Sequence, residues 1–180
     1  MKEKIVIIGA GGHGKVVADA ITAQGKYELL GFIDASIPVG KVIVNDFKVI
    51  QTQADFYLLK DQVDTFIVAV GSNIIREKLV IMAEAVLKPA TVIHPSALIG
   101  SDVTIGVGSV VLANTVINSS SKIGRNTIVN TGSIIDHDCI IGNNIHLSIG
   151  TLVGSNSEIK DGYTSRIGEA IDSFSTVNKN

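Results

Sequence analysis

The chain has 180 residues, of which 46% are hydrophobic and only 4% aromatic, and its formal net charge is −2. Lysine and arginine form no run, which excludes the basic footprint of a nucleic-acid-binding protein and a polybasic membrane patch. The single cysteine excludes an intrachain disulfide, and no apolar stretch reaches the length of a membrane span. We therefore expect a soluble, cytoplasmic protein with an aliphatic core.

The first 88 residues alternate between predicted strands and helices. Apolar runs at 4–9, 28–34 and 65–71 predict strands, and apolar residues at helical spacing predict helices at 14–24 and 73–87. The second helix should end before Lys88-Pro89. This alternation, with a glycine-rich first turn, indicates an α/β domain of Rossmann type over residues 1–88.

The stretch GAGGHG after the first predicted strand matches G-x-G-x-x-G, the fingerprint of dinucleotide-binding loops. Asp34 lies twenty residues beyond Gly14, where a ribose-binding carboxylate is expected. However, 88 residues are too few for two mononucleotide-binding halves, which argues against a dehydrogenase. His13 within the loop either caps the helix or faces solvent or, as we prefer, contacts ligand phosphates at the helix N-terminus.

From residue 91 onward the chain follows a period of six residues. Aliphatic residues recur at this spacing twelve times: Ile93, Ile99, Ile105, Val111, Ile117, Ile123, Val129, Ile135, Ile141, Leu147, Val153 and Ile159. The residue four positions after each is small or β-branched, and the residue directly after each aliphatic one is often Gly, Asn or Asp. Such a repeat predicts an all-β parallel β-helix over 89–180, in which three hexads close one triangular coil and stacked coils share a core.

The six-residue frame is interrupted after Ile159. Ser165 falls on an aliphatic position, Ile167 lies two residues out of register, and Glu169 falls on an inward position. We therefore expect the solenoid to stop or deform near residue 160, with shortened or irregular C-terminal coils.

His137 is the candidate general base. It lies on a predicted corner between Asp136 and Asp138, and a neighbouring carboxylate raises the basicity of an imidazole and fixes its tautomer. His146 faces outward on the next face, where a catalytic role and a surface role are equally compatible with the pattern. Cys139 falls on an inward position and should fill the core. No metal-ligand spacing of histidines and cysteines occurs, so no metal is expected.

Several motifs, taken in order, resemble those of the hexapeptide-repeat family of sialic acid O-acetyltransferases and nucleotide-amino-sugar N-acetyltransferases: GAGGHGKVV, GFID, VGSNIIREKL, VIHPSALIG and VNTGSIIDHDCIIGNNIHLSIGTLVG. The resemblance extends to about residue 158. It implies a left-handed β-helix, acetyl-CoA as co-substrate, and a homotrimer with active sites between subunits. The implied activity is acetyl transfer to the amino group of a UDP-4-amino-4,6-dideoxy sugar, for surface glycan or glycoprotein synthesis.

The resemblance also assigns roles to individual residues. His137 corresponds to the general base, Asp138 to the carboxylate that polarises it, and Asn130 to a polar residue near that site. His146 and the backbone around Gly150 correspond to contacts with the acetyl-CoA thioester. The UDP-sugar would be bound by residues of the N-terminal domain: Gly9, Gly11, Gly12, His13, Gly14, Asp34, Ser72, Asn73 and Arg76.

Two alternatives remain open beside this activity. The motifs do not separate amine from hydroxyl acceptors, so the chain could be a sialic acid O-acetyltransferase. An irregular C-terminus would instead favour a non-catalytic homologue that binds nucleotide sugars but has an incomplete CoA site.

Overall fold

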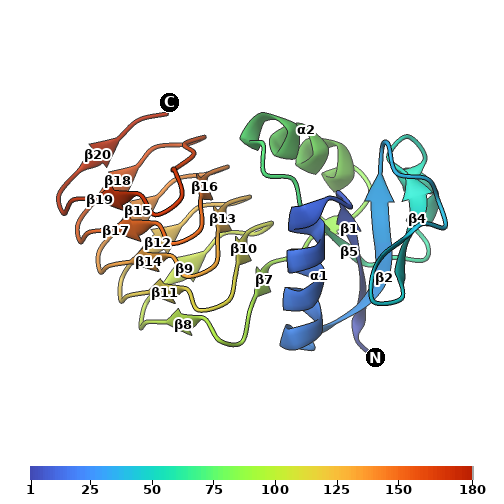
Figure 1. The fold of residues 1–180 in the computed structure, drawn as a ribbon, viewed down its shortest axis with the longest axis horizontal. Coiled ribbons are helices and arrows are strands. Elements are labelled where there is room, and N and C mark those ends of the chain that lie inside the picture. Colours follow the sequence, from blue (N-terminus) through green and yellow to red (C-terminus); the bar gives the residue numbers. More distant parts are fainter. Residues whose placement is uncertain (180) are drawn as a thin grey trace.

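The computed structural model describes residues 1–179, which form an N-terminal sheet with two helices and a solenoid of short strands (Figure 1). The N-terminal sheet has the strand order β3-β4-β2-β1-β5-β6, and all neighbours are parallel except β3 and β4. The elements of this region are β1 (Glu3–Ile8), α1 (Gly12–Gln24), β2 (Tyr27–Asp34), β3 (Val42–Val44), β4 (Phe47–Thr52), a 3-10 turn (Phe56–Leu59), β5 (Thr65–Val68), α2 (Asn73–Glu84) and β6 (Lys88–Pro89).

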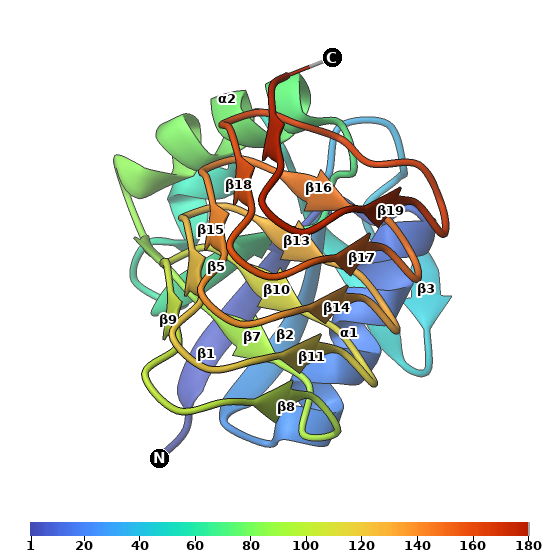
Figure 2. The ribbon, with the colours of Figure 1, turned by 90° about the vertical axis from the view of Figure 1, so that its left-hand side faces the viewer.

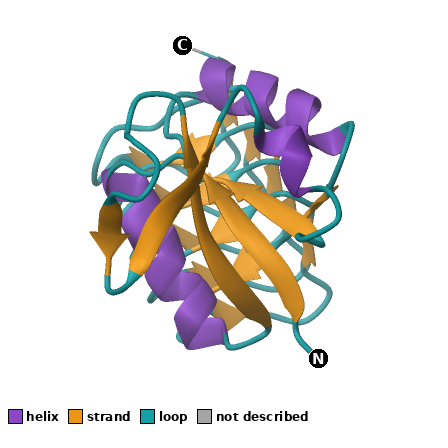
Figure 3. Cartoon of the chain, turned by 90° about the vertical axis from the view of Figure 1, so that its right-hand side faces the viewer, coloured by secondary structure: helices purple, strands orange, loops and turns teal. Residues whose placement is uncertain are grey.

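Each face of the sheet is covered by one helix. Because successive residues of a strand point to opposite faces, neighbouring residues of β1 pack against different helices. Ile5 and Ile7 of β1 share a core with α1, whereas Val6 and Ile8 share a core with α2. The α1 core continues into the solenoid through Val110 and its neighbours. Helix α1 therefore lies between the sheet and the solenoid (Figure 1). Figure 3 shows both helices and the strands as seen from the side of the N-terminal sheet.

The predicted strands at 4–9, 28–34 and 65–71 and both predicted helices are present. Helix α2 ends at Glu84, three residues before its predicted end. The N–H groups of Val86 and Leu87 both bond to the Ala83 carbonyl, which closes a turn before Lys88 starts β6. The pair β3 and β4 had no counterpart among the predicted elements.

The solenoid of residues 92–177 is built from two-residue strands: β7 (Val92–Ile93), β8 (Leu98–Ile99), β9 (Thr104–Ile105), β10 (Val110–Val111), β11 (Val116–Ile117), β12 (Lys122–Ile123), β13 (Ile128–Val129), β14 (Ile134–Ile135), β15 (Ile140–Ile141), β16 (His146–Leu147), β17 (Leu152–Val153), β18 (Glu158–Ile159), β19 (Ala170–Ile171) and β20 (Thr176–Val177). They form three parallel sheets, which we call the docked sheet (β7, β10, β13, β16), the second sheet (β8, β11, β14, β17, β19) and the third sheet (β9, β12, β15, β18, β20). Figure 2 shows the stacked coils. The docked sheet is the one that faces α1.

The aliphatic residues of the hexad frame fill the solenoid interior, as the period predicts. Strands pair at intervals of one coil, so that Val111 stacks on Val129 and Ile117 on Ile135. Most of the twelve lie in one buried core. Ile99 is 39% exposed because β8 is the edge strand of the second sheet.

A hydroxyl group at the small inward position ties each coil to the next. The Ser109 hydroxyl donates to the Gly124 carbonyl (2.9 Å) and accepts from the Thr127 N–H (2.9 Å). Thr127 repeats both bonds one coil later, with the Gly142 carbonyl and the Ile145 N–H. This explains why serine and threonine recur at a buried position, since the hydroxyl satisfies two backbone groups inside the core.

The solenoid does not stop near residue 160, and the expected deformation is confined to the hexad around Ser165. Ile171 and Val177 return to the six-residue frame, and their strands pair with β17 and β18. Buried hydrogen bonds replace the missing aliphatic contact: the Ser165 hydroxyl lies 2.7 Å from the Thr151 hydroxyl and accepts from the Ser148 N–H. A single hexad departs from the pattern, and the coils continue in register on either side of it.

At the following inward position, polar groups again pair with one another. The buried Tyr163 hydroxyl donates to Glu169 (2.5 Å), which explains how a carboxylate occupies that position. Burial and this hydrogen bond raise the pKa of Tyr163 to about 12. The interruption read from the sequence is therefore a local change from apolar to polar packing.

Candidate active site

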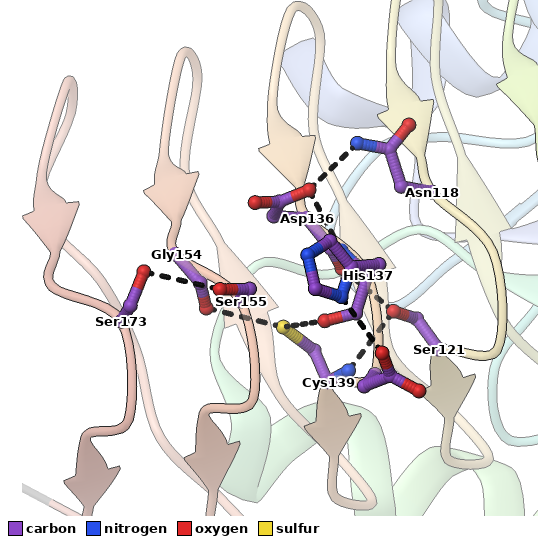
Figure 4. A network of polar contacts seen from close by, with 9 residues as sticks. Asn118, Ser121, Asp136, His137, Cys139, Gly154, Ser155 and Ser173 are labelled. Carbon is purple, nitrogen blue, oxygen red and sulfur yellow. Dashed lines mark hydrogen bonds and ion pairs between the residues drawn. The ribbon is translucent and has the colours of Figure 1, made fainter.

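The first candidate site lies on the corner between β14 and β15, where the chain passes from the second to the third sheet (Figure 4). His137 Nδ1 lies 2.7 Å from Asp138 Oδ2, and the two side chains are 52% and 54% exposed. An ionised carboxylate can only accept, so the hydrogen of this bond is on Nδ1 and Nε2 is the nitrogen left to take a proton. Asp138 has a φ of 59°, a left-handed conformation that aspartate tolerates better than most residues.

Carboxylates surround the His137 imidazole and favour its charged form. The hydrogen bond to Asp138 raises the pKa of His137, and the charges of Asp136 and Asp138 add to this effect. Asp136 is itself held in place, because its Oδ1 accepts from Asn118 Nδ2 (2.9 Å) and from the His137 N–H (2.8 Å). These two bonds lower the pKa of Asp136. The imidazole is therefore accessible and more basic than usual, as a general base requires.

A hydroxyl bridge inside the solenoid spans the turn that carries His137. The buried Ser121 hydroxyl donates to the Asp136 carbonyl (2.7 Å) and accepts from the Cys139 N–H (3.0 Å) (Figure 4). Cys139 is buried, and its thiol donates to the Gly154 carbonyl (3.2 Å). Burial raises the pKa of Cys139, so this thiol fills the core as expected and is poorly suited to act as a nucleophile.

The glycine-rich loop joins β1 to α1. Gly9 has a φ of +109°, and a Cβ on Gly14 would lie 2.3 Å from the Gly9 carbonyl oxygen, so the fold itself requires both glycines. Gly11 and Gly12 have nothing within 4 Å of a Cβ position. The open space at the start of α1 is therefore at Gly11 and Gly12, where the predicted phosphate contacts would fall.

Asp34 anchors the glycine-rich loop. One carboxylate oxygen accepts from the Ala10 N–H (2.9 Å), and the other accepts from the N–H groups of Ser36 and Ile37. Burial opposes ionisation, but these backbone bonds outweigh it and lower the pKa of Asp34. The structure gives the carboxylate a role within the protein, beside the nucleotide contact that the sequence predicts.

The second candidate site is a covered histidine pair where α1 meets the docked sheet. The rings of His13 and His146 have centroids 6.2 Å apart. His13 Nε2 is buried and has no hydrogen-bond partner within residues 1–179. Burial first, then the charges of His146 and Arg76, lower the pKa of His13 to about 4. Burial likewise lowers the pKa of His146.

The contacts of His146 define one tautomer. Its Nδ1 lies 3.2 Å from the Gly71 carbonyl oxygen, which can only accept, so Nδ1 carries the hydrogen. Its Nε2 then accepts from Asn130 Nδ2 (3.2 Å). The orientation of this amide is fixed, because Asn130 Oδ1 accepts from the Thr131 N–H (2.9 Å). His146 is therefore neutral with its hydrogen on Nδ1.

Asn73 and Arg76, predicted to bind substrate, instead connect α2 to the solenoid. The buried Arg76 uses all five of its N–H groups: Nε donates to Asn126 O, Nη1 to Val70 O and Gly71 O, and Nη2 to Asn73 Oδ1 and Ile145 O. Asn73 Nδ2 contacts three groups of the coil that follows β18: Gly162 O, Tyr163 O and Thr164 Oγ1.

These contacts argue against direct substrate binding by Asn73 and Arg76, which stays a prediction. Neither side chain has a donor to offer to a phosphate, because both are engaged with backbone groups of the solenoid and of the loop before α2. Ser72 caps α2 by accepting from the Ile75 N–H (3.5 Å). The Gly150 N–H donates to the Thr131 carbonyl, so this group is not free to contact a thioester.

The two candidate sites lie on different parts of the coil. His13, His146, Asn130 and Gly71 come together at the docked sheet, whereas His137 lies on the corner between the second and third sheets. Asn130 and His137 stand at opposite ends of β14, so one chain does not bring Asn130 to the base as the resemblance implies. Sequence reasoning also missed Asn118 and Ser121, although both lie one eighteen-residue coil before the His137 turn.

Two family models match the chain, and they overlap at α2. Residues 4–83 match the PglD N-terminal domain, and residues 75–178 match the GMPPB C-terminal domain. None of the helices within residues 1–179 has the length and hydropathy needed to cross a membrane.

Similar proteins of known structure or activity include three acetyltransferases. The acetyltransferase domain of PglB from Neisseria gonorrhoeae, solved with acetyl coenzyme A, is 38% identical; the TM-score is 0.73, with 99% of this chain and 89% of that chain covered. A histidine-to-asparagine mutant of perosamine N-acetyltransferase from Caulobacter crescentus, solved with CoA and GDP-perosamine, is 30% identical; the TM-score is 0.78, with 98% and 86% covered.

The third relative is the UDP-N-acetylbacillosamine N-acetyltransferase of Bacillus subtilis, which is 28% identical over 124 residues. The match covers 61% of this chain and 51% of that protein, so the chain spans about half the length of this curated relative.

Proposed function

This chain belongs to the hexapeptide-repeat family of sugar N-acetyltransferases, and we propose that it transfers the acetyl group of acetyl-CoA to the amino group of a nucleotide-linked amino sugar. The observation that carries the proposal is the accessible His137–Asp138 pair, with Nδ1 held by the carboxylate and Nε2 open. As acceptor we propose a UDP-4-amino-4,6-dideoxy sugar for surface glycan or glycoprotein synthesis. The relatives are named for UDP- and GDP-linked amino sugars, which supports the wider class.

His137 acts as the general base in this proposal. Its Nε2 takes a proton from the acceptor amine as the amine nitrogen attacks the thioester carbonyl carbon of acetyl-CoA. The C–N bond forms, and the carbonyl oxygen carries the negative charge of the tetrahedral intermediate. A hydrogen-bond donor aimed at that oxygen is typically worth ~3 kcal/mol. When the intermediate collapses, the C–S bond breaks and the imidazolium returns the proton to the thiolate of CoA.

The N-terminal domain holds the nucleotide part of the acceptor. The first N–H groups of α1 lack partners within the helix, and the helix dipole favours an anion at that end. Gly11 and Gly12 leave space there for the phosphates to approach the backbone. We assign Gly9 and Gly14 to loop geometry, His13 to the edge of this site, and Asp34 to loop anchoring beside the nucleoside.

A homotrimer with active sites between subunits completes the proposal. The outer face of the second sheet carries an apolar column of Leu98, Val116, Ile134, Leu152 and Ala170, in which Leu98, Ile134 and Leu152 are exposed. Large exposed apolar patches commonly mark interfaces. A second copy against this face would close the groove that begins beside Asp136 and would bring the Asn130–His146 cluster of one chain towards His137 of another. Acetyl-CoA would lie in that groove.

We also propose a left-handed course for the coils and a cytoplasmic location, as expected from the sequence. The non-catalytic alternative has lost the observation that favoured it, because the coils continue in register to Val177.

Mass spectrometry of acetyl transfer tests the function. The protein would be incubated with acetyl-CoA and a panel of UDP- and GDP-linked amino sugars, with sialic acid as a hydroxyl acceptor. We expect acetylation of an amino sugar on nitrogen and release of free CoA. Product from sialic acid alone would indicate O-acetylation. No product from any acceptor, with nucleotide-sugar binding intact, would contradict the proposed activity.

A further inference from the structure

Arg76 is a buried guanidinium that is held by neutral oxygens. It is 1% exposed, and all five hydrogen-bond acceptors that surround it are carbonyl or amide oxygens. Burial lowers the pKa of Arg76 to about 10, although the charge of Glu77 opposes this. Buried arginines are usually paired with a carboxylate or phosphate. A buried guanidinium surrounded only by neutral oxygens is therefore unusual.

The acceptors come from two structural units. Asn126 and Ile145 lie at the same corner of two successive coils, whereas Val70 and Gly71 belong to the loop between β5 and α2. The planar fork of one guanidinium therefore fixes the β5–α2 loop against two coils at once. Lysine could not reproduce this, because its ammonium is a single point with three donors.

The same loop controls the orientation of His146. The Gly71 carbonyl accepts from both Arg76 Nη1 (3.2 Å) and His146 Nδ1 (3.2 Å). His146 Nε2 in turn accepts from Asn130, whose amide keeps one Nδ2 hydrogen without a protein acceptor in residues 1–179. A continuous chain of contacts thus runs from Arg76 through Gly71 and His146 to the Asn130 amide.

We infer that Arg76 is a positioning residue: by fixing the Gly71 carbonyl, it holds His146 in the Nδ1–H tautomer and thereby aims the free N–H of Asn130 at the substrate. The inference rests on the proposed function, in which a second copy of the chain brings the Asn130–His146 cluster towards His137. It assigns Arg76 a role that differs from the direct substrate contact predicted from its sequence motif.

The charges around His146 act in the same direction. The charged and titratable groups that face the ring are Arg76 from α2 and His13 from α1, while Glu77 acts on Arg76 itself. Burial is the main cause of the lowered pKa of His146; the hydrogen bond to Gly71 opposes it, and the positive charge of Arg76 adds to it. Since a protonated His146 could not accept from Asn130, this environment preserves the chain of contacts.

NMR of the wild-type protein with isotope-labelled histidine provides the first test. Ring nitrogen and carbon shifts distinguish the Nδ1–H from the Nε2–H tautomer. We expect His146 to be neutral with its hydrogen on Nδ1 at pH 7. An Nε2–H signature, or a protonated ring, would overturn the inference, and this reading needs no variant and no substrate.

Two variants of Arg76 separate geometry from charge. Arg76→Lys retains a positive charge without the fork, and Arg76→Met removes both. We expect Arg76→Lys to mix the tautomers of His146 and to lower kcat on the order of tenfold to a hundredfold, as small misplacements near reacting groups do, with little change in nucleotide-sugar affinity. Arg76→Met should in addition raise the pH at which His146 titrates.

Asn73→Ala is the matched control, because it removes the contacts of α2 with the coil after β18 and one acceptor of Arg76 Nη2, while the Arg76 Nη1 bond to the Gly71 carbonyl remains. We expect it to lower the melting temperature while the Nδ1–H signature persists. A folded Arg76→Lys protein with the wild-type tautomer and kcat would contradict the inference and leave the proposed function standing. Absence of acetyl transfer in the wild type would instead contradict the function, and the NMR result would still decide the link between Arg76 and His146.

Discussion

The two histidine regions of this molecule use the same side chain in opposite electrostatic settings. On the solenoid corner, His137 is half exposed and lies between two carboxylates, which raise its pKa. At the domain junction, His13 and His146 are mostly covered and lie near a guanidinium, which together with burial lowers their pKa values. The first setting favours an imidazolium, and the second favours a neutral ring.

This difference follows from where each histidine stands in the coil. A corner projects into solvent and can place its own sequence neighbours around the ring, as Asp136 and Asp138 do. Outward positions of the docked sheet are covered by α1, so the ring of His146 meets backbone carbonyls and the Arg76 charge. These settings fit two different roles: His137 transfers protons, whereas His13 and His146 stay neutral and keep a fixed hydrogen-bond pattern.

The largest effect should come from His137→Ala. A positioned general base contributes typically 10²- to 10⁴-fold, so we expect the rate of acetyl transfer to fall by about three orders of magnitude. Product formation would be measured by mass spectrometry, and nucleotide-sugar binding by calorimetry. A rate of acetyl transfer close to that of the wild type would show that His137 is not the general base. A lower rate with unchanged nucleotide-sugar affinity would show that the substitution affects the chemical step.

The pH dependence of stability should distinguish the two regions by sign. Because the pKa of His13 is about 4 in the folded state and 6.5 is its ordinary value, the unfolded chain binds more protons between these values. The contribution of neutral His13 to the free energy of unfolding is therefore complete above pH 6.5. It decreases as the pH falls towards 4, by about 3 kcal/mol at most. Chemical denaturation across this range should show a weaker pH dependence in His13→Gln.

His137→Gln provides the control of opposite sign for that experiment. A raised pKa in the folded state contributes stability below pH 6.5, which is lost as the pH rises through the folded value. Removing His137 should therefore make the loss of stability on acidification steeper, while His13→Gln makes it shallower. Equal behaviour of the two variants would contradict the assigned environments.

The hydroxyl bridges allow stability and catalysis to be separated. Ser121→Ala removes the bond to the Asp136 carbonyl and leaves the Cys139 N–H unpaired, which should lower the free energy of unfolding by about 1–3 kcal/mol. Ser157→Ala removes an equivalent bridge, to Asp172 and Ser175, which spans the turn two coils after that of His137. We expect similar stability losses in urea titrations, but a reduced kcat only for Ser121→Ala. An equal kcat in both would show that Ser121 does not hold the catalytic turn.

Asp138→Asn should have the smallest effect. Asparagine tolerates the left-handed conformation and can still accept from His137 Nδ1, but it removes the charge that supports the imidazolium. The acidic limb of the pH–rate profile should move to lower pH, because the pKa of His137 falls towards its ordinary value. A tenfold change corresponds to one pKa unit, and we expect kcat to fall by about that factor. If the acidic limb of the pH–rate profile stays at the same pH, a group other than His137 determines it.

The repeat and the general-base candidate were accessible to sequence reasoning because both are local patterns. The six-residue period predicted the aliphatic interior, and the neighbours of His137 in sequence are also its neighbours in space. The solenoid end was misjudged because the pattern counted aliphatic residues only, whereas Ser165 fills an inward position by hydrogen bonding to Thr151, and the partly exposed Glu169 accepts from Tyr163.

The domain junction could not be predicted in this way. Arg76 bonds to Asn126 and Ile145, fifty and sixty-nine residues away, and Asn73 reaches residues 162–164. These contacts depend on how α2 docks onto particular coils, and no periodicity encodes that placement. Their polar character therefore suggested a ligand where the structure has backbone carbonyls.

Titration of the histidines in the wild-type protein by NMR tests this contrast most directly. We predict that His137 titrates above 6.5, that His146 titrates below it, and that His13 stays neutral to about pH 4. A His137 that titrates at or below 6.5, or a His13 that titrates in the ordinary range, would contradict the account of one basic and one neutral histidine region.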